Sequence, residues 1–489
     1  MKRVYSILLA VMLLFSLCAC GADTTTAADS ESKPETQATQ PSTAPTEPVP
    51  EGLQVGFARV NVTPDNNVNI SGGDSKNRIS NGYRDPICVT CVAIGTGESR
   101  VLLYTMDYIT VSSDYTDTAE AQITEATGVP AERIIMNATH THSGPAIAYD
   151  YNSIIPYRNV FYEGAVKAAE KAIENQTAAE VYTGAVETEG LVFVRHYEMD
   201  NGTFAGANYG SFSGSIKGHA YEGDAQVQII KFARKDKKDI IMISNPAHAT
   251  AVSGTDRDLL SADIAYSVRN TVEEATDANV AYFIGAAGDQ VPSSRIVSEG
   301  STEDYLIYGE RMGKFIVDAL PTLTEAEGGD PEVNTRQFTG KTIKEGLERL
   351  ADARAVREVA SKYGNSAPET KAAVAQYGFS SVYQATAIVA RNGRGDTQTM
   401  TLNAMSLGDV SFIFAPYEMF SENGKFIKEN SPYAMTFVIT CSENHQGYLP
   451  SVNGFRVECY ESHVTTYERG TAETLADTYV EMLTQLKNG

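Results

Sequence analysis

From Leu53 to its last residue, the chain alternates short apolar runs with longer segments in which apolar residues recur every three or four positions. The runs 240–244 and 280–284 are typical of buried strands, whereas 159–174 places its apolar residues on one helical face. A chain that keeps alternating strands with helices packs them in layers around one core. The sequence therefore predicts an α/β domain over residues 52–489, with layered mixed β-sheets flanked by helices.

The predicted elements cover the whole of this domain. Gly95-Thr96-Gly97 predicts a hairpin turn between two apolar runs, and a second hairpin is predicted over 398–415. We predict strands at 55–62, 87–94, 101–106, 133–138, 225–233, 239–244, 280–284 and 435–440, with three more starting near residues 382, 400 and 410. We predict helices at 115–127, 159–174, 264–275, 305–320, 343–362, 418–428 and 471–486.

Side chains that can bind metal or carry protons follow six of these strands. In α/β folds, the loops beyond the carboxyl ends of the strands gather into the active site. We therefore expect the active site in the loops at these strand ends. In chain order, the side chains are Asp107, His140 with His142, His248, Asp289, Glu418, and the group Glu443, His445 and Tyr448.

The segment 137–145 places His140 and His142 one residue apart, directly after a predicted strand. Their rings point the same way if the strand continues and diverge if a loop has begun. A neutral imidazole suits Zn²⁺, and a complete site needs further ligands from elsewhere in the chain. His248 is the best further candidate, and a carboxylate such as Glu418 could complete the set. The spacing alone leaves open a loop whose histidines are exposed or cap backbone groups.

Other polar residues have weaker assignments. His219 and His463 have no convincing partner in the sequence, and we interpret both as surface or locally hydrogen-bonded residues. His445, near the end of a strand, could support the ligands from behind. Asp107 and Asp289 could orient ligands in the same way, or could serve the structure at the ends of their strands.

The first twenty residues predict a targeting segment. Met1-Lys2-Arg3 is basic, residues 7–17 are apolar, and Leu17-Cys18-Ala19-Cys20 matches a bacterial lipobox. The apolar run is too short to span a bilayer, which takes about 20 residues. We expect Cys20 to carry a lipid that anchors the protein to a bacterial membrane, at the cell surface or on the periplasmic side. Residues 21–51, rich in Thr, Ser and Pro and without aromatics, predict a disordered tether.

Charge and cysteine content restrict the partners and cofactors. The net charge of −23 argues against a nucleic-acid binder, which would present a basic face. Cys88 and Cys91 have the spacing of half a zinc ribbon, but they lie inside a predicted strand. Cys441 and Cys459 could form a disulfide in an oxidising compartment.

The stretch Asn-Ala-Thr-His-Thr-His-Ser-Gly-Pro at 137–145 resembles the hallmark segment of the neutral/alkaline non-lysosomal ceramidases. Shorter segments resemble other parts of that family's catalytic domain in the same order along the chain. They are 55–64, 240–248, 285–289, 416–418, and 447–448 together with 460–461.

This resemblance implies a zinc-dependent amidohydrolase that cleaves the C–N bond of ceramide or a related N-acyl lipid. It implies one Zn²⁺ per chain, held by His140, His248, Glu418 and Tyr448. It also implies that three residues surround the scissile carbonyl, namely His142, Arg195 and Tyr460. In such enzymes zinc lowers the pKa of a bound water toward about 7, and the resulting hydroxide attacks the amide. His142 and Tyr460 would stabilise the oxyanion, and His142 could pass a proton to the leaving amine.

Three features depart from the family pattern. Residues 290–293 read Gln-Val-Pro-Ser, so the serine of the family's segment is missing and a serine nucleophile is not expected. The sequence stops after the predicted helix 471–486, so we expect the family's C-terminal β-sandwich module to be absent. The segment 347–381 is largely helical and could line the entrance, where acyl-chain selectivity is set.

Two other functions fit parts of the sequence. The first keeps the metal and changes the bond, giving a zinc ester or phosphoester hydrolase. The second is a non-catalytic surface lipoprotein that binds a glycan or lipid, which the tether and the acidic, tyrosine-rich composition permit.

Overall fold

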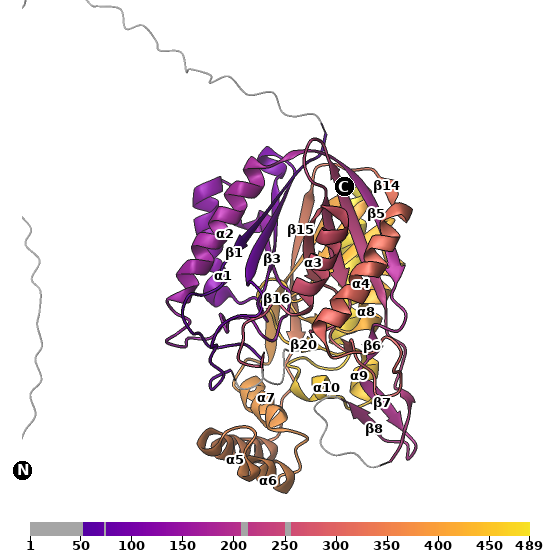
Figure 1. Cartoon of the computed structure of the whole chain (residues 1–489). Helices are drawn as coiled ribbons and strands as arrows, with labels where there is room; N and C mark the ends of the chain where they lie inside the picture. The colour runs from indigo at the N-terminus through magenta and orange to yellow at the C-terminus, as the bar shows by residue number, and fades with distance from the viewer. Residues whose placement is uncertain (1–51, 73–74, 207–213, 250–255) are drawn as a thin grey trace, which may run out of the picture. The chain divides into compact units, whose positions relative to one another are not determined.

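A nine-stranded mixed sheet carries most of the strands whose ends bear candidate site residues (Figure 1). Its order is β12-β11-β10-β5-β1-β2-β3-β4, with β14 added beside β5. β3 pairs with β4, and β11 with β12, in parallel, while the remaining pairs are antiparallel. The strands are β1 (Gln54–Asn61), β2 (Cys88–Ile94), β3 (Val101–Met106), β4 (Ile134–Ala138), β5 (Thr177–Glu187), β10 (Gln226–Arg234), β11 (Ile240–Asn245), β12 (Asn279–Ile284) and β14 (Thr324–Ala326).

The computed structural model describes residues 52–72, 75–206, 214–249 and 256–489. All of these belong to the compact unit Val49–Gly489. The predicted signal peptide 1–20 with Cys20, and the predicted tether 21–51, lie outside the described residues. Within the described ranges, we find no helix of the length and apolar character that a bilayer crossing requires.

A four-stranded sheet packs against one face of the large sheet. Its order is β15-β16-β17-β19, formed by β15 (Glu332–Lys341), β16 (Thr397–Leu407), β17 (Val410–Phe414) and β19 (Met435–Ile439). Their shared core joins residues such as Phe232 and Phe283 of the large sheet to Phe412 and Phe437 of the small one. The predicted hairpins are confirmed, because β2 pairs with β3 and β16 with β17 in antiparallel register.

Strict alternation along the central strands explains why the sheets are layered. In β11, Ile240 and Met242 face the sheet–sheet core, whereas Ile241 and Ile243 face the helices on the other side. Successive side chains of a strand point to opposite faces, so a continuous apolar run is buried on both. The predicted fold class, layered mixed β-sheets flanked by helices, is therefore confirmed.

Helices cover the outer faces of both sheets. α1 (Ser113–Thr127) and α2 (Tyr157–Glu174) pack on β1–β4, and α3 (Ile264–Thr276) and α4 (Tyr305–Ala319) pack on β10–β12. α8 (Ser421–Asn430) and α11 (Thr471–Asn488) cover the small sheet. The order of layers is thus helix, sheet, sheet, helix.

Three helices form an insertion between β15 and β16 at one end of the molecule (Figure 1). They are α5 (Leu347–Tyr363), α6 (Pro368–Gln376) and α7 (Val382–Asn392), and they share a small core of their own. The strand predicted from Val382 is wrong, because Ser381 caps a helix there and Val382, Ala385 and Ile388 recur every three residues on its buried face.

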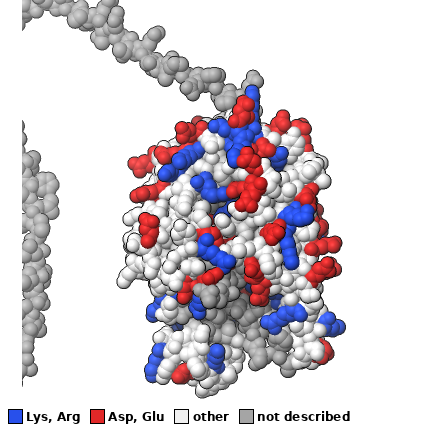
Figure 2. All heavy atoms as spheres, in the orientation of Figure 1, with Lys and Arg blue, Asp and Glu red and all other residues white. Residues whose placement is uncertain are grey.

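Two other differences concern strands. The predicted helix 418–428 begins later, because Glu418–Met419 form the short strand β18 and α8 starts at Ser421. β5 and β15 were not predicted, because their exposed faces are polar and break the apolar pattern. Figure 2 shows acidic and basic side chains interspersed on one face of the body, without an extended basic surface.

The buried ion pair of Asp107 and Arg269 offers a test of this packing. The distance from Arg269 Nη1 to Asp107 Oδ1 is 2.9 Å, and the side chains of Arg269 and Asp107 are 4% and 0% exposed, respectively. We expect Asp107→Asn to lower the free energy of unfolding by about 3 kcal/mol, because it leaves a buried guanidinium without its counter-charge. Urea unfolding at constant m-value measures this. Asp318→Asn, in an exposed pair with Lys314, is the control and should leave the midpoint unchanged; equal losses would contradict the assignment.

Candidate metal and catalytic site

His140 and His142 converge, although the strand before them has already ended. β4 stops at Ala138, and His140 adopts a φ of 62°. This left-handed conformation is uncommon outside glycine and turns the chain sharply. As a result the two rings meet, with their Nε2 atoms 3.4 Å apart and their centroids 5.0 Å apart. The spacing predicted rings that point the same way on a continued strand, or rings that diverge in a loop. Neither prediction holds, because a loop has begun and the two rings nevertheless converge.

His248, in the loop after β11, completes a group of three imidazoles. Its ring centroid lies 4.8 Å from that of His140 and 4.6 Å from that of His142. One ring nitrogen from each of the three lies within 4.8 Å of the others. The backbone N–H of His248 donates to the carbonyl of Gln290 at 3.0 Å, which joins this loop to the segment after Asp289.

Backbone carbonyls fix the tautomers of two of these rings. His140 Nδ1 lies 2.6 Å from the carbonyl oxygen of Ile109, and His248 Nδ1 lies 2.8 Å from that of Ala249. A carbonyl only accepts, so both Nδ1 atoms must donate. The Nε2 atoms then face the group, and that of His248 is buried without a hydrogen-bond partner among the described residues. Metal-binding histidines are commonly oriented in this way.

Glu418 adds a carboxylate to the same group. Its Oε2 lies 3.2 Å from His140 Nε2, yet it accepts no hydrogen bond from the described residues. Burial raises the pKa of Glu418, but the charges of His140, His445 and His248 outweigh it and hold that pKa below its ordinary value. Gly288 allows this approach, because a Cβ at that position would lie 2.8 Å from the backbone oxygen of Glu418.

The protonation of the histidines suits a bound cation. Burial lowers the pKa of His248 to about 3, with a further contribution from His140, and burial likewise lowers that of His142. Burial also lowers the pKa of His140, but Glu418 and Cys441 raise it above its ordinary value. The proton that this favours at His140 occupies a place that a metal ion can take instead. Neutral imidazoles and one ionised carboxylate, with orphaned atoms facing inward, therefore fit a zinc ion.

Arg195, Tyr448 and Tyr460 lie beside this group. The guanidinium carbon of Arg195 is 5.6 Å from the ring centroid of Tyr448, and the rings of Tyr448 and Tyr460 are 6.0 Å apart. Tyr448 belongs to β20 (Tyr448–Leu449), which pairs in parallel with β18 so that Tyr448 is opposite Glu418. Tyr460 begins the short helix α10 (Tyr460–Val464). The structure thus brings all seven predicted site residues into one neighbourhood.

Hydrogen bonds between the two sheets hold this neighbourhood together. The N–H of Ala138 donates to the carbonyl of Cys441 at 3.2 Å, and that of Glu443 donates to Met136 at 2.9 Å. Asn137 Nδ2 also donates to the carbonyl of Thr440. These contacts tie the end of β4 to the end of β19, so the histidine loop and the loop that leads to Tyr448 lie side by side.

A second group of potential ligands, His196, Cys459 and Glu461, is already saturated. His196 Nδ1 lies 2.9 Å from the hydroxyl of Tyr221, and its Nε2 lies 2.9 Å from Glu461 Oε2. Glu461 Oε1 accepts from Arg195, which also donates to the carbonyl of Gly288 at 3.1 Å. This group therefore fixes Arg195 rather than offering free ligand atoms.

Sequence reasoning missed Glu461, His196 and Cys441 as parts of the site. Glu461 directly follows Tyr460 in a matched segment, which was the only signal for it. Cys441 Sγ lies 3.6 Å from His140 Nδ1. The disulfide considered between Cys441 and Cys459 is not formed, because both are free thiols, as are Cys88 and Cys91.

The remaining polar residues serve the structure. Asp107 binds Arg269 and the N–H of Cys88, and Asp289 accepts from the N–H and hydroxyl of Ser421 at the start of α8. His219 and His463 form hydrogen bonds to residues distant in the sequence, Val194 and Ser294 for His219 and Ser380 for His463, so the local bonds predicted for them are not the ones observed. His445 Nε2 lies 3.8 Å from Glu418 Oε1, in the supporting position considered for it.

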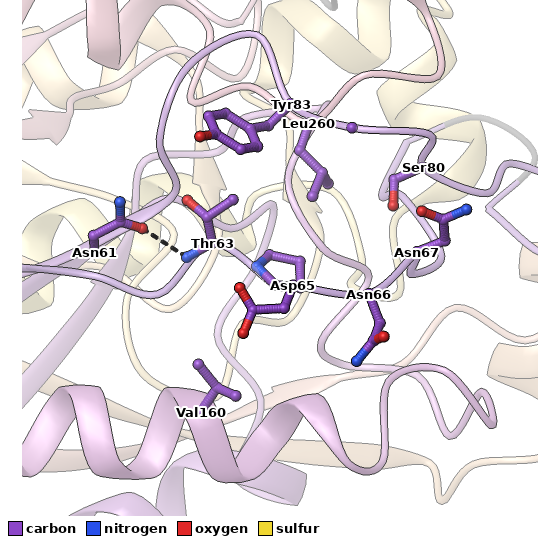
Figure 3. A pocket seen from close by; sticks show the side chains of 11 residues that line it. Asn61, Thr63, Asp65, Asn66, Asn67, Ser80, Tyr83, Val160 and Leu260 are labelled. Carbon is purple, nitrogen blue, oxygen red and sulfur yellow. Dashed lines mark hydrogen bonds between the residues drawn. The ribbon is translucent and has the colours of Figure 1, made fainter.

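A polar pocket of about 560 Å³ opens beyond the end of β1, beneath Tyr83 and Leu260 (Figure 3). Its walls carry asparagines, Thr63 and Asp65. Among the described residues that line it there is no histidine or cysteine, and none of the seven site residues. The pocket is therefore separate from the candidate metal centre.

Comparisons with known proteins agree with this architecture. No protein-family model and no curated protein matches the sequence. Among solved structures, the neutral ceramidase from Pseudomonas aeruginosa matches with a TM-score of 0.63 and 15% identity, over 89% of this chain and 75% of that chain. A ceramidase complexed with C2 matches with a TM-score of 0.66 and 14% identity, over the same shares of the two chains, 89% and 75%. The resemblance to neutral ceramidases is therefore confirmed at the level of the fold.

The buried carboxyl group of Glu443 makes the stability of the fold depend on pH. Burial raises its pKa to about 8, with Glu120 adding to the effect and the N–H of Met136 opposing it. A carboxyl whose pKa rises on folding stabilises the fold below its unfolded pKa, and this contribution is lost as pH rises toward 8. We expect the unfolding free energy of Glu443→Gln, measured in urea, to fall less than that of the wild type between pH 5 and 8. The exposed Glu481→Gln should track the wild type, and parallel curves for Glu443→Gln would contradict the assignment.

Proposed function

We propose that the protein is a zinc-dependent hydrolase of the C–N amide bond in an N-acyl substrate, ceramide or a related N-acyl lipid. The observation that carries this proposal is the buried group of His140, His142 and His248 with Glu418, in which orphaned ligand atoms face one another. The ceramidase-like fold supports it independently. We further propose that a lipid on Cys20 holds the enzyme at the extracytoplasmic side of a bacterial membrane.

The ligand set that we propose is His140, His248, Glu418 and Tyr448. When bound there, zinc supplies Lewis-acid activation of water for attack at neutral pH. The carbonyls of Ile109 and Ala249 orient the two imidazoles, so their Nε2 atoms need no reorganisation to bind.

Three further residues act on the substrate in this proposal. Burial keeps His142 neutral, so its imidazole can take a proton and return it to the leaving amine. Burial raises the pKa of Tyr460, so its hydroxyl stays protonated and can donate to the developing oxyanion. Arg195, fixed by Glu461 and Gly288, presents a positive charge to the same region.

Elemental analysis of the fragment from residue 52 tests the metal. We expect about one zinc per chain and amide hydrolysis that a chelator abolishes and Zn²⁺ restores. His140→Ala and Glu418→Gln should lose both metal and activity, because each removes a ligand. His219→Gln is the matched control, since the hydrogen bonds of its imidazole within the described part of the chain go to Val194 and Ser294 and not to the proposed ligands. Full hydrolysis in His140→Ala would refute the proposal, and cleavage of esters alone would move it to the ester hydrolase.

Glu461→Gln separates positioning from metal binding. The amide loses the charge that holds Arg195 and His196, while the proposed ligands are untouched. We expect kcat to fall by about 100-fold with the zinc content unchanged, a loss typical of one misplaced electrostatic group. Glu422→Gln, a carboxylate bonded to Ser451 and Asn453 away from the site, should keep its kcat. Loss of zinc in Glu461→Gln would show a general structural role instead.

A further inference from the structure

A groove of about 710 Å³ lies between α7 and the loop 444–447, which directly precedes Tyr448. Small residues leave the space open, with Ala387 and Ala390 on one wall and Gly447 on the other. Its polar lining consists mainly of side-chain amides and hydroxyls. Such groups pair with the N–H and C=O groups of an extended peptide and are poorly suited to an alkyl chain.

The groove leads to the proposed catalytic residues. Tyr383 precedes Ala387 by four residues on α7, and Tyr460 precedes the lining residue Val464 by four residues on α10. Residues four apart share a helix face, and the rings of Tyr383 and Tyr460 meet edge to face at 6.1 Å. The face of α7 that lines the groove therefore continues to Tyr460.

Hydrogen bonds hold α7 against α10. Arg391 donates to the carbonyls of His463 at 3.2 Å and Thr465 at 3.0 Å. The hydroxyl of Ser380 lies 2.9 Å from His463 Nδ1. The groove is thus preformed, so binding in it does not require the insertion to be ordered first.

Arg394 is a cation in the lining of the groove. No Asp or Glu lies among the described residues that line the groove, and no ion pair of Arg394 is found within the described part of the chain. Its Nη1 donates to Gln398 at 2.8 Å and to Thr466 at 3.0 Å, which aims the guanidinium. Gln398 in turn donates to Gln446. What sets Arg394 apart is its place, because it lines a groove that contains no described carboxylate.

We propose that this groove binds the peptide arm of an N-acylated peptide, with the free C-terminal carboxylate on Arg394. A guanidinium fork matches a carboxylate with two parallel hydrogen bonds. Arg394 lies two residues past the end of α7, and at about 1.5 Å of rise per residue the segment from Tyr383 to Arg394 spans roughly 15 Å. An extended peptide covers this distance with about four residues, at roughly 3.4 Å each. The inference rests on the proposed function and narrows its substrate to amides whose amine half is a short peptide.

Hydrolysis of N-octanoyl-oligoglycines with one to four glycines, each as free acid and as C-terminal amide, tests this. We expect the free acid of the tetraglycine compound to have a KM about tenfold below that of its amide, and no difference for the monoglycine pair. Arg394→Gln should remove the tenfold preference by raising the KM of the tetraglycine acid to that of its C-terminal amide. Lys362→Gln, an exposed cation on α5 of the same insertion, is the matched control and should keep the preference.

A binding measurement separates this inference from the proposed function. Calorimetry of tetraglycine and tetraglycinamide on the intact protein needs no turnover. We expect the wild type to bind tetraglycine more tightly than tetraglycinamide. If Arg394→Gln and the groove-filling Ala387→Leu both lose this difference in affinity, the groove is shown to bind the peptide carboxylate, even where no N-acyl substrate is hydrolysed. The groove inference is overturned if the N-octanoyl bond is hydrolysed but the free acid and the C-terminal amide have equal KM values at every length. It is also overturned if Arg394→Gln keeps the preference for the free acid. In both cases the proposed hydrolase function stands.

Discussion

The site depends on the hydrogen bonds that tie the end of β4 to the end of β19. These strands belong to different sheets, and Ala138 and Asn137 bond across to the segment 440–441. Without this junction, the histidines of one sheet and the carboxylate and tyrosines that follow the other would have no reason to meet. The shared apolar core of the two sheets sets their distance, and the junction sets their alignment.

Much of this arrangement follows from the sequence, because its causes are local. The apolar runs of β11 and β12 alternate between two buried faces, and polar residues mark where each strand ends. The convergence of His140 and His142 could not be predicted, because it depends on one positive φ that spacing does not reveal. The partners of Arg195 were equally hidden, since Glu461 lies 266 residues away in sequence. The strand predicted from Val382 is a helix, because residues such as Val382, Ile388 and Val389 suit a strand as well as a helix, and packing on α5 and α10 decides the state of the segment.

Two groups of His, Cys and Glu side chains lie close together in this protein, and their hydrogen bonds tell them apart. In the group of His196 and Glu461 every nitrogen and carboxylate oxygen has a protein partner. In the group of His140 and Glu418, buried ligand atoms face one another without such partners. An unsatisfied buried polar atom costs about 1–3 kcal/mol, so a fold does not retain several together unless something compensates them. The cation of the proposed function would provide that compensation, and the saturated group beside it keeps Arg195 in place.

The sheet framework and the helical insertion α5–α7 form different parts of the region around Tyr460. A likeness at 14–15% identity shows that the layers and strands are arranged in the same way. The region beyond Tyr460 is built instead by α7 and the loop 444–447, whose small and amide-bearing residues leave a polar channel ending at a cation. Because a neutral lipid chain gains nothing from an unpaired guanidinium, while a carboxylate gains a charge-assisted bond, the insertion favours a polar amine half. In the function proposed above, the residues at the strand ends would therefore carry out the hydrolysis, and the insertion would select which N-acyl compound reaches them.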